Sequence, residues 1–362
     1  MKLHLIFIGN KFVYNLSLKE YILRKIEQKT DFIDSVTYFK DGDNSIFLYL
    51  EEELNSYDNI IVITTKQNFS TVGKLICTAA SDNQILQEGM LIPQKCTLFT
   101  DRSYLLEYKN SITNVIQMDE GQNMPQILLE EKNSKATIHL FEELKDTTLA
   151  VLNPIAQTYD VKINVTKIID EWLQIDISSN KYGDISKFIN SAKKLLPAQL
   201  ITAENLAVYI IERLSTLQKK LTFAESCSGG LLSYYFTKNN GASKILDGSL
   251  VTYSNTLKEN WLAVEHTTLI ENGAVSAEVV SEMSEGALNV SEADYAISIS
   301  GIAGDTGGTV EKPVGTVYIG VRSKDNQKEE RLQFSGDRNY IQSQSVLYAL
   351  KMLLLIDKKM FF

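Results

Sequence analysis

Short apolar segments alternate with longer amphipathic stretches along the first third of the chain. The segments 3–9, 34–39 and 58–64 predict strands, and the last of these is apolar on both faces. The stretches 16–28 and 45–54 repeat apolar residues every three or four positions, which predicts helices. Strands buried on both faces and separated by helices are typical of a parallel α/β sheet, and we expect one here.

The middle of the chain, from about 125 to 197, has a different order of elements. A strand at 136–141 and a helix at 142–159 are followed by two alternating strands, VKINVT and WLQIDIS, and by the helix SKFINSAKKLL. This order predicts a small α+β module. Pro197 cannot continue the preceding helix and marks the predicted end of the module.

Helices and strands alternate again from 198 to 362, where most of the 19 glycines lie. Strands are predicted at LTFAES, GSLVTYS, ADYAISIS, GTVYIGVRS and EERLQFS, between amphipathic helices. Ser276 is the predicted N-cap of the helix SAEVVSEMSEGAL, and Asp337 is the predicted N-cap of the C-terminal helix. The whole chain is therefore predicted to be an α/β protein of three domains, 1–124, 125–197 and 198–362.

Composition narrows the possible functions. The 362 residues include 36 Lys+Arg and 45 Asp+Glu, a net charge of −9, which disfavours nucleic acid and anionic membranes as partners. No apolar run approaches the roughly 20 residues that a membrane helix needs. The three cysteines are far apart and the three histidines are isolated, so the sequence predicts neither a disulfide scaffold nor a metal site. We expect a soluble, cytoplasmic protein.

The segment AESCSGG, 224–230, combines a strand end with the start of a helix. Such a turn places a hydroxyl or thiol (Ser226, Cys227 or Ser228) at the carboxyl edge of a sheet. It also directs unpaired N–H groups of a helix N-terminus toward the same place, where they could hold a developing oxyanion. The alternative is an ordinary strand-to-helix turn with a serine cap.

Three further segments carry candidate chemistry. In VTYSNTLK, Lys258 could act as a general base near a serine, although most lysines are solvated surface groups. The glycine-rich segment SGIAGDTGGT, 300–309, could approach a phosphate with its backbone amides, or could be a plain flexible loop. It has neither the GK[ST] of a P-loop nor the GxGxxG of a dinucleotide fingerprint. Arg338, at the predicted start of the last helix, suits phosphate recognition or is simply a surface arginine.

The motifs AESCSGG, GASK, VTYSNTLK, ENGAVS, SGIAGDTGGTVEKPVGTVYIGV and SGDR occur in an order that resembles the C-terminal domain of the CinA family. The resemblance covers the last domain, and it implies a three-layer α/β/α fold. It also implies a nicotinamide-nucleotide amidase, which converts nicotinamide mononucleotide to nicotinate mononucleotide and ammonia. The implied apparatus is a serine and a lysine with no metal and no cofactor, and the implied partners are the pyridine-nucleotide substrate and a second copy of the chain in a homodimer.

The resemblance assigns roles to individual residues. Ser226 matches the nucleophile, Lys258 its base, Tyr253 the tyrosine beside the lysine, and Ser243 a serine between the two, through which the proton could pass. Cys227 is a lower-ranked alternative nucleophile, because no histidine is at hand to form its thiolate. Backbone N–H groups are expected to hold the oxyanion at Gly229 and Gly230. The residues expected to hold the substrate are Ser300, Gly301, Gly304, Gly307, Gly308, Thr309 and Arg338.

The chain departs from the family pattern at two places near these motifs. Ser228 stands where relatives often have threonine, which keeps the hydroxyl. Gln342 stands where a second arginine usually follows the GDR motif, and this predicts an altered affinity for the substrate.

The first two domains resemble the rest of longer family members, which carry a molybdopterin-binding-like domain followed by a KH-like module. The functional motifs of the first domain are replaced. GNKFV, from Gly9 to Val13, stands in place of GTELL, and TTKQNFSTVGK, from Thr64, stands in place of the GGLGPTxDD loop that binds phosphate and metal. Without its glycines and carboxylates we expect no Mg²⁺ site and no ADP-ribose pyrophosphatase activity, but a structural or dimerising remnant.

Two functions from different classes follow. The first is an amidohydrolase of pyridine-nucleotide salvage. The second is a non-enzymatic, nucleotide-binding or competence- or damage-associated accessory protein, which the replaced loops of the first domain would favour. Binding of the nucleotide without cleavage would distinguish the second from the first.

Overall fold

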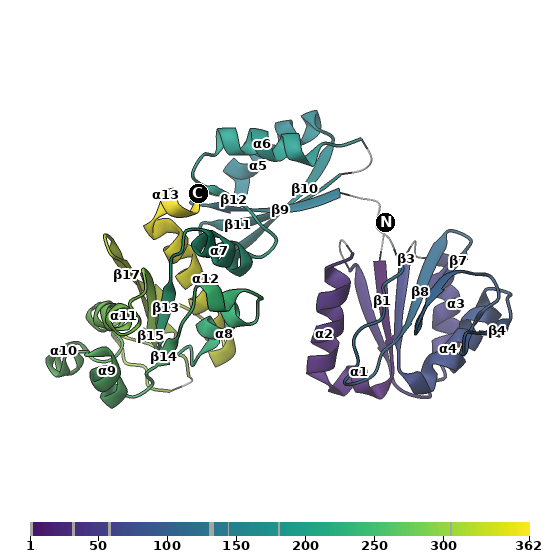
Figure 1. The fold of residues 1–362 in the computed structure, drawn as a ribbon, viewed down its shortest axis with the longest axis horizontal. Coiled ribbons are helices and arrows are strands. Elements are labelled where there is room, and N and C mark those ends of the chain that lie inside the picture. Colours follow the sequence, from purple (N-terminus) through teal and green to yellow (C-terminus); the bar gives the residue numbers. More distant parts are fainter. Residues whose placement is uncertain are drawn as a thin grey trace. The chain divides into compact units, whose positions relative to one another are not determined.

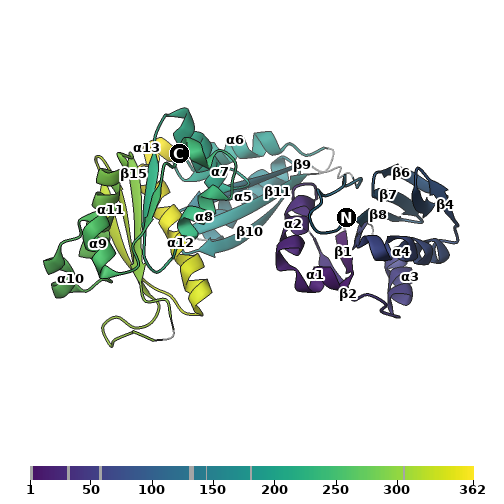
Figure 2. The ribbon, with the colours of Figure 1, turned by 60° about the horizontal axis from the view of Figure 1, so that its bottom comes forward.

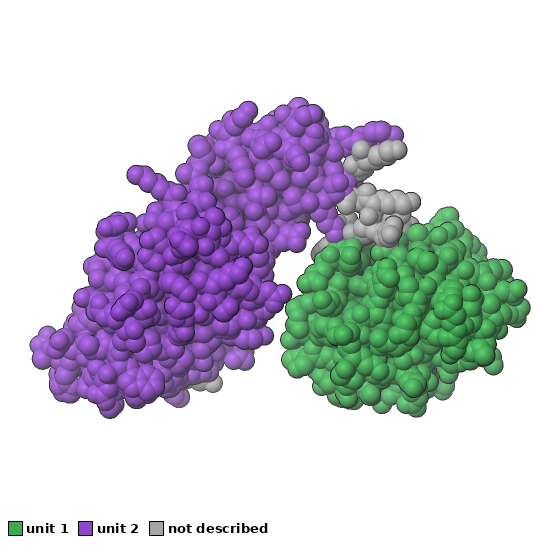
Figure 3. All heavy atoms as spheres, in the orientation of Figure 1, with its two compact units in different colours: residues 1–132 green, residues 133–362 purple. Residues whose placement is uncertain are grey.

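The computed structural model describes residues 3–30, 33–56, 59–129, 134–143, 145–179, 182–304 and 306–362. The chain separates into two compact units, residues 1–132 (unit 1) and 133–362 (unit 2), coloured separately in Figure 3. Asp58, Leu144 and Asp305, which belong to segments considered above, lie outside the described residues.

Unit 1 is built on a six-stranded sheet in the order β2-β1-β3-β8-β7-β6 (Figure 1). Four strands are parallel: β1 (Leu3–Ile8), β2 (Ser35–Phe39), β3 (Asn59–Thr64) and β8 (Ser111–Gln117). Two antiparallel strands, β7 (Ser103–Tyr108) and β6 (Cys96–Thr100), extend one edge. The three predicted strands are confirmed, but the sheet is mixed rather than purely parallel.

Helices cover both faces of this sheet. The helices are α1 (Asn10–Tyr14), α2 (Leu16–Glu27), α3 (Ile46–Ser56) and α4 (Lys66–Ala79). One core lies between the sheet and α3 and α4, and the other between the sheet and α2. Every residue of β1 and β3 is buried, because both are central strands covered on both faces. The hairpin β4 (Gln84–Gln87) and β5 (Met90–Pro93), helix α4 and strands β6 to β8 were not predicted.

Unit 2 begins with the predicted strand–helix–strand–strand–helix order, which is confirmed. These elements are β9 (Ser134–Phe141), α5 (Lys145–Thr158), β10 (Val161–Ile169), β11 (Trp172–Ser179) and α6 (Ile185–Leu195). A short strand, β12 (Leu200–Thr202), completes an antiparallel sheet in the order β10-β11-β9-β12. Phe141 and Trp172 of this sheet are buried in the same core cluster as Leu350 of the C-terminal helix, so the segments on either side of Pro197 share one core.

The remainder of unit 2 is a three-layer α/β/α structure (Figures 1 and 2). Its sheet has the order β14-β13-β15-β16-β17, with bounds β13 (Leu221–Glu225), β14 (Ser249–Val251), β15 (Tyr295–Gly301), β16 (Thr316–Ser323) and β17 (Gln327–Gln333). Strands β13, β14 and β15 are parallel, and β16 and β17 are antiparallel to their neighbours. The fold class predicted from the sequence is confirmed.

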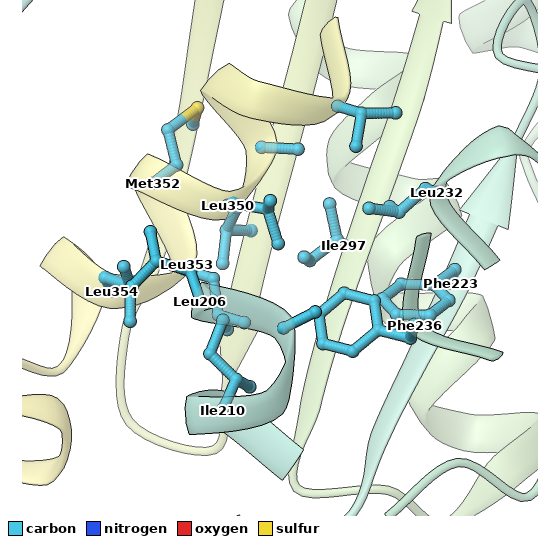
Figure 4. Close-up of a cluster of buried hydrophobic side chains, with 14 of the residues drawn as sticks. Leu206, Ile210, Phe223, Leu232, Phe236, Ile297, Leu350, Met352, Leu353 and Leu354 are labelled. Carbon is cyan, nitrogen blue, oxygen red and sulfur yellow. The ribbon is translucent and has the colours of Figure 1, made fainter. Parts of the chain in front are cut away.

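The two outer layers pack on opposite faces of β13. One layer contains α7 (Leu206–Thr216), α8 (Leu231–Thr237) and α12 (Arg338–Ile356), and the other contains α9 (Asn255–Leu262), α10 (His266–Asn272) and α11 (Ala277–Ser291). Phe223 points into the first layer with Phe236, Ile297 and Leu350, as Figure 4 shows, and its neighbour Ala224 points into the second. This alternation fixes the direction of the residues that follow at the strand end.

Two predicted helix caps are confirmed. The side chain of Ser276 accepts a hydrogen bond from the N–H of Val279 at the start of α11, and Asp337 accepts one from Tyr340 at the start of α12. Among the described residues, no helix is long and apolar enough to cross a membrane.

Candidate active site

The carboxyl ends of the parallel strands β13, β14 and β15 bring together segments that are far apart in the sequence. Ser226 follows β13, and Lys258 lies one turn into α9, whose N-cap is Ser254. The Nζ atom of Lys258 lies 3.0 Å from the Oγ atom of Ser226. The structure therefore places the predicted nucleophile and the predicted base within hydrogen-bond distance, across 32 residues of sequence.

Lys258 is a buried amine, with 1% of its surface exposed. Besides Ser226, its Nζ atom contacts the carbonyl oxygen of Thr252, to which it donates at 2.7 Å. No ion pair to Lys258 occurs among the described residues. Burial lowers the pKa of the amine from 10.5 to about 8. About a tenth of the amine is then neutral at pH 7, and this fraction has a lone pair that can accept the Ser226 proton.

Burial shifts the pKa of the Cys227 thiol in the opposite direction. It is 5% exposed, and burial raises its pKa to about 12. The thiol therefore stays protonated at physiological pH and is a poor nucleophile. The structure favours Ser226 over Cys227.

The backbone of the turn corrects the predicted oxyanion donors. Gly229 and Gly230 have φ angles of 61° and 97°, which glycine adopts without strain. Their N–H groups are already used: Gly229 donates to the carbonyl of Ser226 (3.1 Å), and Gly230 donates to the carboxylate of Glu225 (3.0 Å). Neither is free to bind a substrate oxygen, so this assignment was wrong.

The predicted position of Ser243 between the nucleophile and the base is also wrong. Ser243 lies in the short 3₁₀ helix Ala242–Lys244 and is exposed. The carbonyl of Ile245, two residues later, accepts a hydrogen bond from Leu221, the first residue of β13. Ser226 follows the other end of that strand, roughly 16 Å away at about 3.3 Å per residue. The proton relay through Ser243 is not supported, because Lys258 reaches Ser226 directly.

A pocket of about 340 Å³ opens beside Ser226 and Lys258. Its lining is Ser226, Cys227, Tyr253, Lys258, Ala274, Val275, Ser300, Gly301, Ile302, Ala303, Gly304, Thr306, Gly307 and Arg338. Most of the residues predicted to hold the substrate are therefore in the pocket wall. Gly308 and Thr309 are not: Gly308 packs on Pro313, and Thr309 forms a turn with Lys312.

The glycine-rich loop is anchored rather than loose. The buried hydroxyl of Ser300 donates to the carbonyl of Ala274 at 2.7 Å and so fixes the neighbouring wall of the pocket. A Cβ atom at Gly301 would lie 2.9 Å from the backbone oxygen of Thr316, so only glycine fits there. Lys312 donates to the carbonyl of Asn272 at 2.7 Å. These contacts disfavour the plain flexible loop.

Arg338 and Tyr253 meet in the pocket wall. The Nη2 atom of Arg338 donates to the Tyr253 hydroxyl at 2.5 Å, and Tyr253 is 60% exposed. A Cβ atom at Gly304 would lie 3.1 Å from the Arg338 guanidinium, so this glycine lets the loop approach the cation. The arrangement gives the pocket a planar, positively charged donor that is open to solvent.

Sequence reasoning missed the roles of Glu225 and Gln342. The Glu225 carboxylate accepts several hydrogen bonds from the turn and from the start of α8. Gln342 donates from its Nε2 atom to the carbonyl of Cys227 at 2.7 Å. An acidic residue just before a helix start is a recognisable capping signal, and it could have identified Glu225. No sequence signal locates Gln342, because the contact joins residues 115 positions apart.

At the corresponding sheet edge of unit 1, polar groups pair with one another beside a pocket of about 470 Å³, whose lining includes Ile8, Asp41 and Asn68. Lys66, in the segment that stands in place of the GGLGPTxDD loop, begins α4, and its N–H donates to Asp119 at 2.9 Å. Asp41 exchanges hydrogen bonds with Asn10 and accepts another from Asn68. No cluster of three or more His, Cys, Asp or Glu side chains suited to a metal occurs within the described ranges.

A family model described as the CinA C-terminal domain matches residues 203–356. The segment 203–356 of this chain belongs to the CinA family. The whole candidate site, from Ser226 to Arg338, lies inside the matched segment. The α/β fold of unit 1 fits the molybdopterin-binding-like part of longer CinA proteins.

Several CinA relatives align with this part of the chain. A protein of Thermoanaerobacter sp. (strain X514), named as competence-damage inducible, is 41% identical over 184 residues, which are 51% of this chain and 42% of the relative. A CinA-like protein of Thermotoga sp. (strain RQ2) is 44% identical over 151 residues, which are 42% of this chain and 37% of the relative. The chain thus matches less than half the length of these relatives.

Among solved structures, the competence/damage inducible protein CihA from Agrobacterium tumefaciens is 36% identical to the chain. The match covers 42% of this chain and 93% of that one, with a TM-score of 0.41.

Proposed function

We propose that the C-terminal part of unit 2 hydrolyses the carboxamide of nicotinamide mononucleotide to give nicotinate mononucleotide and ammonia. The single observation that carries the proposal is the 3.0 Å contact between the buried Lys258 amine and the Ser226 hydroxyl at the wall of a pocket. An amine that burial keeps partly neutral is the base that a serine nucleophile needs.

The reaction has two halves. The neutral Lys258 amine takes the proton of the Ser226 hydroxyl, and the oxygen attacks the carboxamide carbon. The resulting tetrahedral adduct collapses with cleavage of the C–N bond, and the Lys258 ammonium returns its proton to the nitrogen, which leaves as ammonia. A water molecule then attacks the ester with Lys258 again as base, and this releases the carboxylic acid and restores the serine. These steps use side chains of the chain alone and need no cofactor.

The charge of the pocket supports an anionic substrate. The chain carries a net charge of −9, yet the described lining includes two basic residues, Lys258 and Arg338, and no acidic one. The Arg338 guanidinium, close to the backbone of Gly304, is suited to bind a phosphate. Nicotinamide mononucleotide carries both a carboxamide and a phosphate. The carboxamide suits the Ser226–Lys258 pair, and the phosphate suits Arg338.

The test is ammonia release from nicotinamide mononucleotide by the full chain. S226A is the inactive variant, and S243A is the matched control, because Ser243 is an exposed serine at the far end of β13. We expect wild type and S243A to turn over alike, and S226A to show only background. Equal release by wild type and S226A would reject the amidase.

A non-catalytic nucleotide-binding role is the second candidate, because relatives are named for competence and damage rather than for a reaction. Isothermal titration with the same nucleotide separates the two functions. Saturable binding without ammonia release would favour it over hydrolysis. We further propose that the chain acts in the cytoplasm as a homodimer, which size-exclusion chromatography with light scattering can test.

A further inference from the structure

Glu225 lies directly before the candidate nucleophile and has no part in the proton transfers proposed above. It is the last residue of β13, with 0% of its surface exposed. Its carboxylate accepts hydrogen bonds from the N–H groups of Gly230 (3.0 Å), Leu232 (3.1 Å) and Ser233 (2.8 Å). The hydroxyls of Ser228 and Ser233 donate to it as well. A buried carboxylate is tolerated only with such donors, so these bonds tie the turn to the strand end.

Gln342 holds the same turn from α12, which lies in the same layer as α8. Its Nε2 atom, on the second turn of α12, donates to the carbonyl of Cys227 at 2.7 Å. The N–H of Cys227 shares a planar, trans peptide unit with the carbonyl of Ser226, which accepts from Gly229 at 3.1 Å. The backbone of Cys227 is therefore held on both sides, at this peptide unit and at its own carbonyl. Two side chains therefore hold the turn. Glu225 accepts from N–H groups at its end, and Gln342 donates to the carbonyl of Cys227.

These contacts leave particular donors unused. The N–H of Ser226 donates to Ile299 at 2.9 Å, and the next glycines of the turn are engaged as described above. Within the part of the chain that the structure describes, the N–H of Ser228 has no acceptor, and the N–H of Cys227 has none other than its own thiol sulfur, a weak acceptor. Cys227 also lines the pocket.

We propose that Glu225 and Gln342 are positioning residues, which hold the turn so that the N–H of Cys227 donates to the carboxamide oxygen as it becomes negative. The N–H that follows a serine nucleophile has this role where the serine lies on a strand-to-helix turn. The proposal rests on the proposed amide hydrolysis at Ser226. Both residues act through the backbone and touch no substrate.

Substitutions at three positions, Glu225, Gln342 and Asp294, test this assignment. E225Q keeps the shape of the side chain but places an amide NH₂ against N–H and O–H donors. Q342M removes the donor to the Cys227 carbonyl on a half-buried helix position and is the milder change. D294N is the matched control, because Asp294 also accepts a backbone N–H, from Lys220 at 2.9 Å, but at the opposite end of β13.

Two quantities are measured for each variant. The temperature is chosen from thermal denaturation curves so that all variants are folded. The first is kcat and KM for nicotinamide mononucleotide. The second is the rate at which an alkyl fluorophosphonate modifies Ser226, read by mass spectrometry, in which the serine oxygen displaces fluoride from phosphorus. The second readout does not depend on the identity of the natural substrate, and S226A supplies its blank.

We expect E225Q to lower kcat and the modification rate by about 10²-fold, as loss of an oxyanion donor does, with KM changed by less than about threefold. Q342M should lower both rates roughly tenfold, and E225D should restore part of the loss seen in E225Q. D294N should lower the melting temperature and leave both rates unchanged, because a purely structural carboxylate affects only stability.

The outcomes separate the two proposals. Modification of Ser226 that depends on Glu225 and Gln342, without turnover of the nucleotide, supports the positioning role and rejects that substrate. Wild-type rates in folded E225Q and Q342M overturn the positioning role. A wild-type chain that the fluorophosphonate does not modify at Ser226 overturns it too, since no activated hydroxyl would then exist. Equal loss of rate in D294N would also contradict it.

Discussion

In both units, loops meet at the carboxyl edge of a sheet, but the polar groups at the two edges have different partners. At the carboxyl ends of parallel strands, α/β proteins place the residues that bind ligands. In unit 2 this edge carries a buried amine, Lys258, next to a hydroxyl, with a pocket beside both. In unit 1 the edge also has a pocket, of about 470 Å³, but its polar groups are paired with one another: Asp119 accepts from the N–H of Lys66, and Asp41 pairs with Asn10. The fold supplies the edge, and a buried amine that contacts a hydroxyl but no carboxylate makes it a candidate site.

The buried polar groups of the two units show the same contrast. In unit 1, the ring of His4 contacts the Glu53 carboxylate at 2.7 Å and the Thr37 hydroxyl at 2.9 Å, so both ring nitrogens have partners. In unit 2, the described residues offer the Lys258 amine only two hydrogen-bond partners, the carbonyl of Thr252 and the Ser226 hydroxyl. A buried cation without a carboxylate is unfavourable for stability, and it is the condition under which an amine becomes a base.

The largest expected effect on activity comes from removing the candidate nucleophile at the edge of unit 2. S226A removes the nucleophile and should lower kcat by at least about 10⁴-fold, as loss of a serine nucleophile does in other hydrolases. Steady-state ammonia release measures this, and circular dichroism checks that the variant is folded. Residual turnover within tenfold of wild type would mean that another group attacks the substrate.

The second effect is a dependence of activity on pH. Burial lowers the pKa of Lys258 to about 8, and the amine must be neutral to act as base. Therefore kcat/KM should rise about tenfold per pH unit below pH 8 and level off above it. K258R should be inactive throughout, because a guanidinium stays protonated. A flat profile between pH 6 and 9 would show that Lys258 is not the base.

The third effect concerns stability. The pKa of Lys258 falls from 10.5 to about 8 on folding, so below pH 8 the folded chain carries a buried ammonium at a cost of roughly 3 kcal/mol. K258M removes this cost together with two hydrogen bonds worth about 1 kcal/mol each, which leaves a net gain of about 1 kcal/mol at pH 7. Between pH 8 and 10.5 the cost in wild type disappears, so the gain should shrink and reverse. Urea denaturation at pH 7 and pH 10 measures both values, and an unchanged difference would contradict the linkage.

The order of elements could be predicted from the sequence because burial on both faces and helical spacing are local signals. Ser226 and Lys258 followed from their motifs, since each lies at a strand-to-helix junction of one sheet edge. The donors of the turn could not be predicted, because Gly229 and Gly230 look free until the internal hydrogen bonds are known. Ser243 was misplaced because the resemblance gives the order of the motifs but not the end of β13 to which the loop that carries Ser243 returns.

The smallest expected effect tests the paired polar groups at the edge of unit 1. D119A removes the acceptor of the Lys66 N–H at the start of α4 and an ion pair with Lys11. Loss of a helix-terminal acceptor should lower the stability of unit 1 by about 1 kcal/mol and leave kcat for the nucleotide unchanged. Hydrogen exchange of the amides in α4 measures the first effect, with D101A, an exposed carboxylate of the same unit, as the control. If titration calorimetry instead shows saturable binding of inorganic phosphate to D119A, the edge of unit 1 has kept a ligand site that the Asp119 carboxylate covers. The two units would then differ in whether the ligand site is covered, and not in whether one exists.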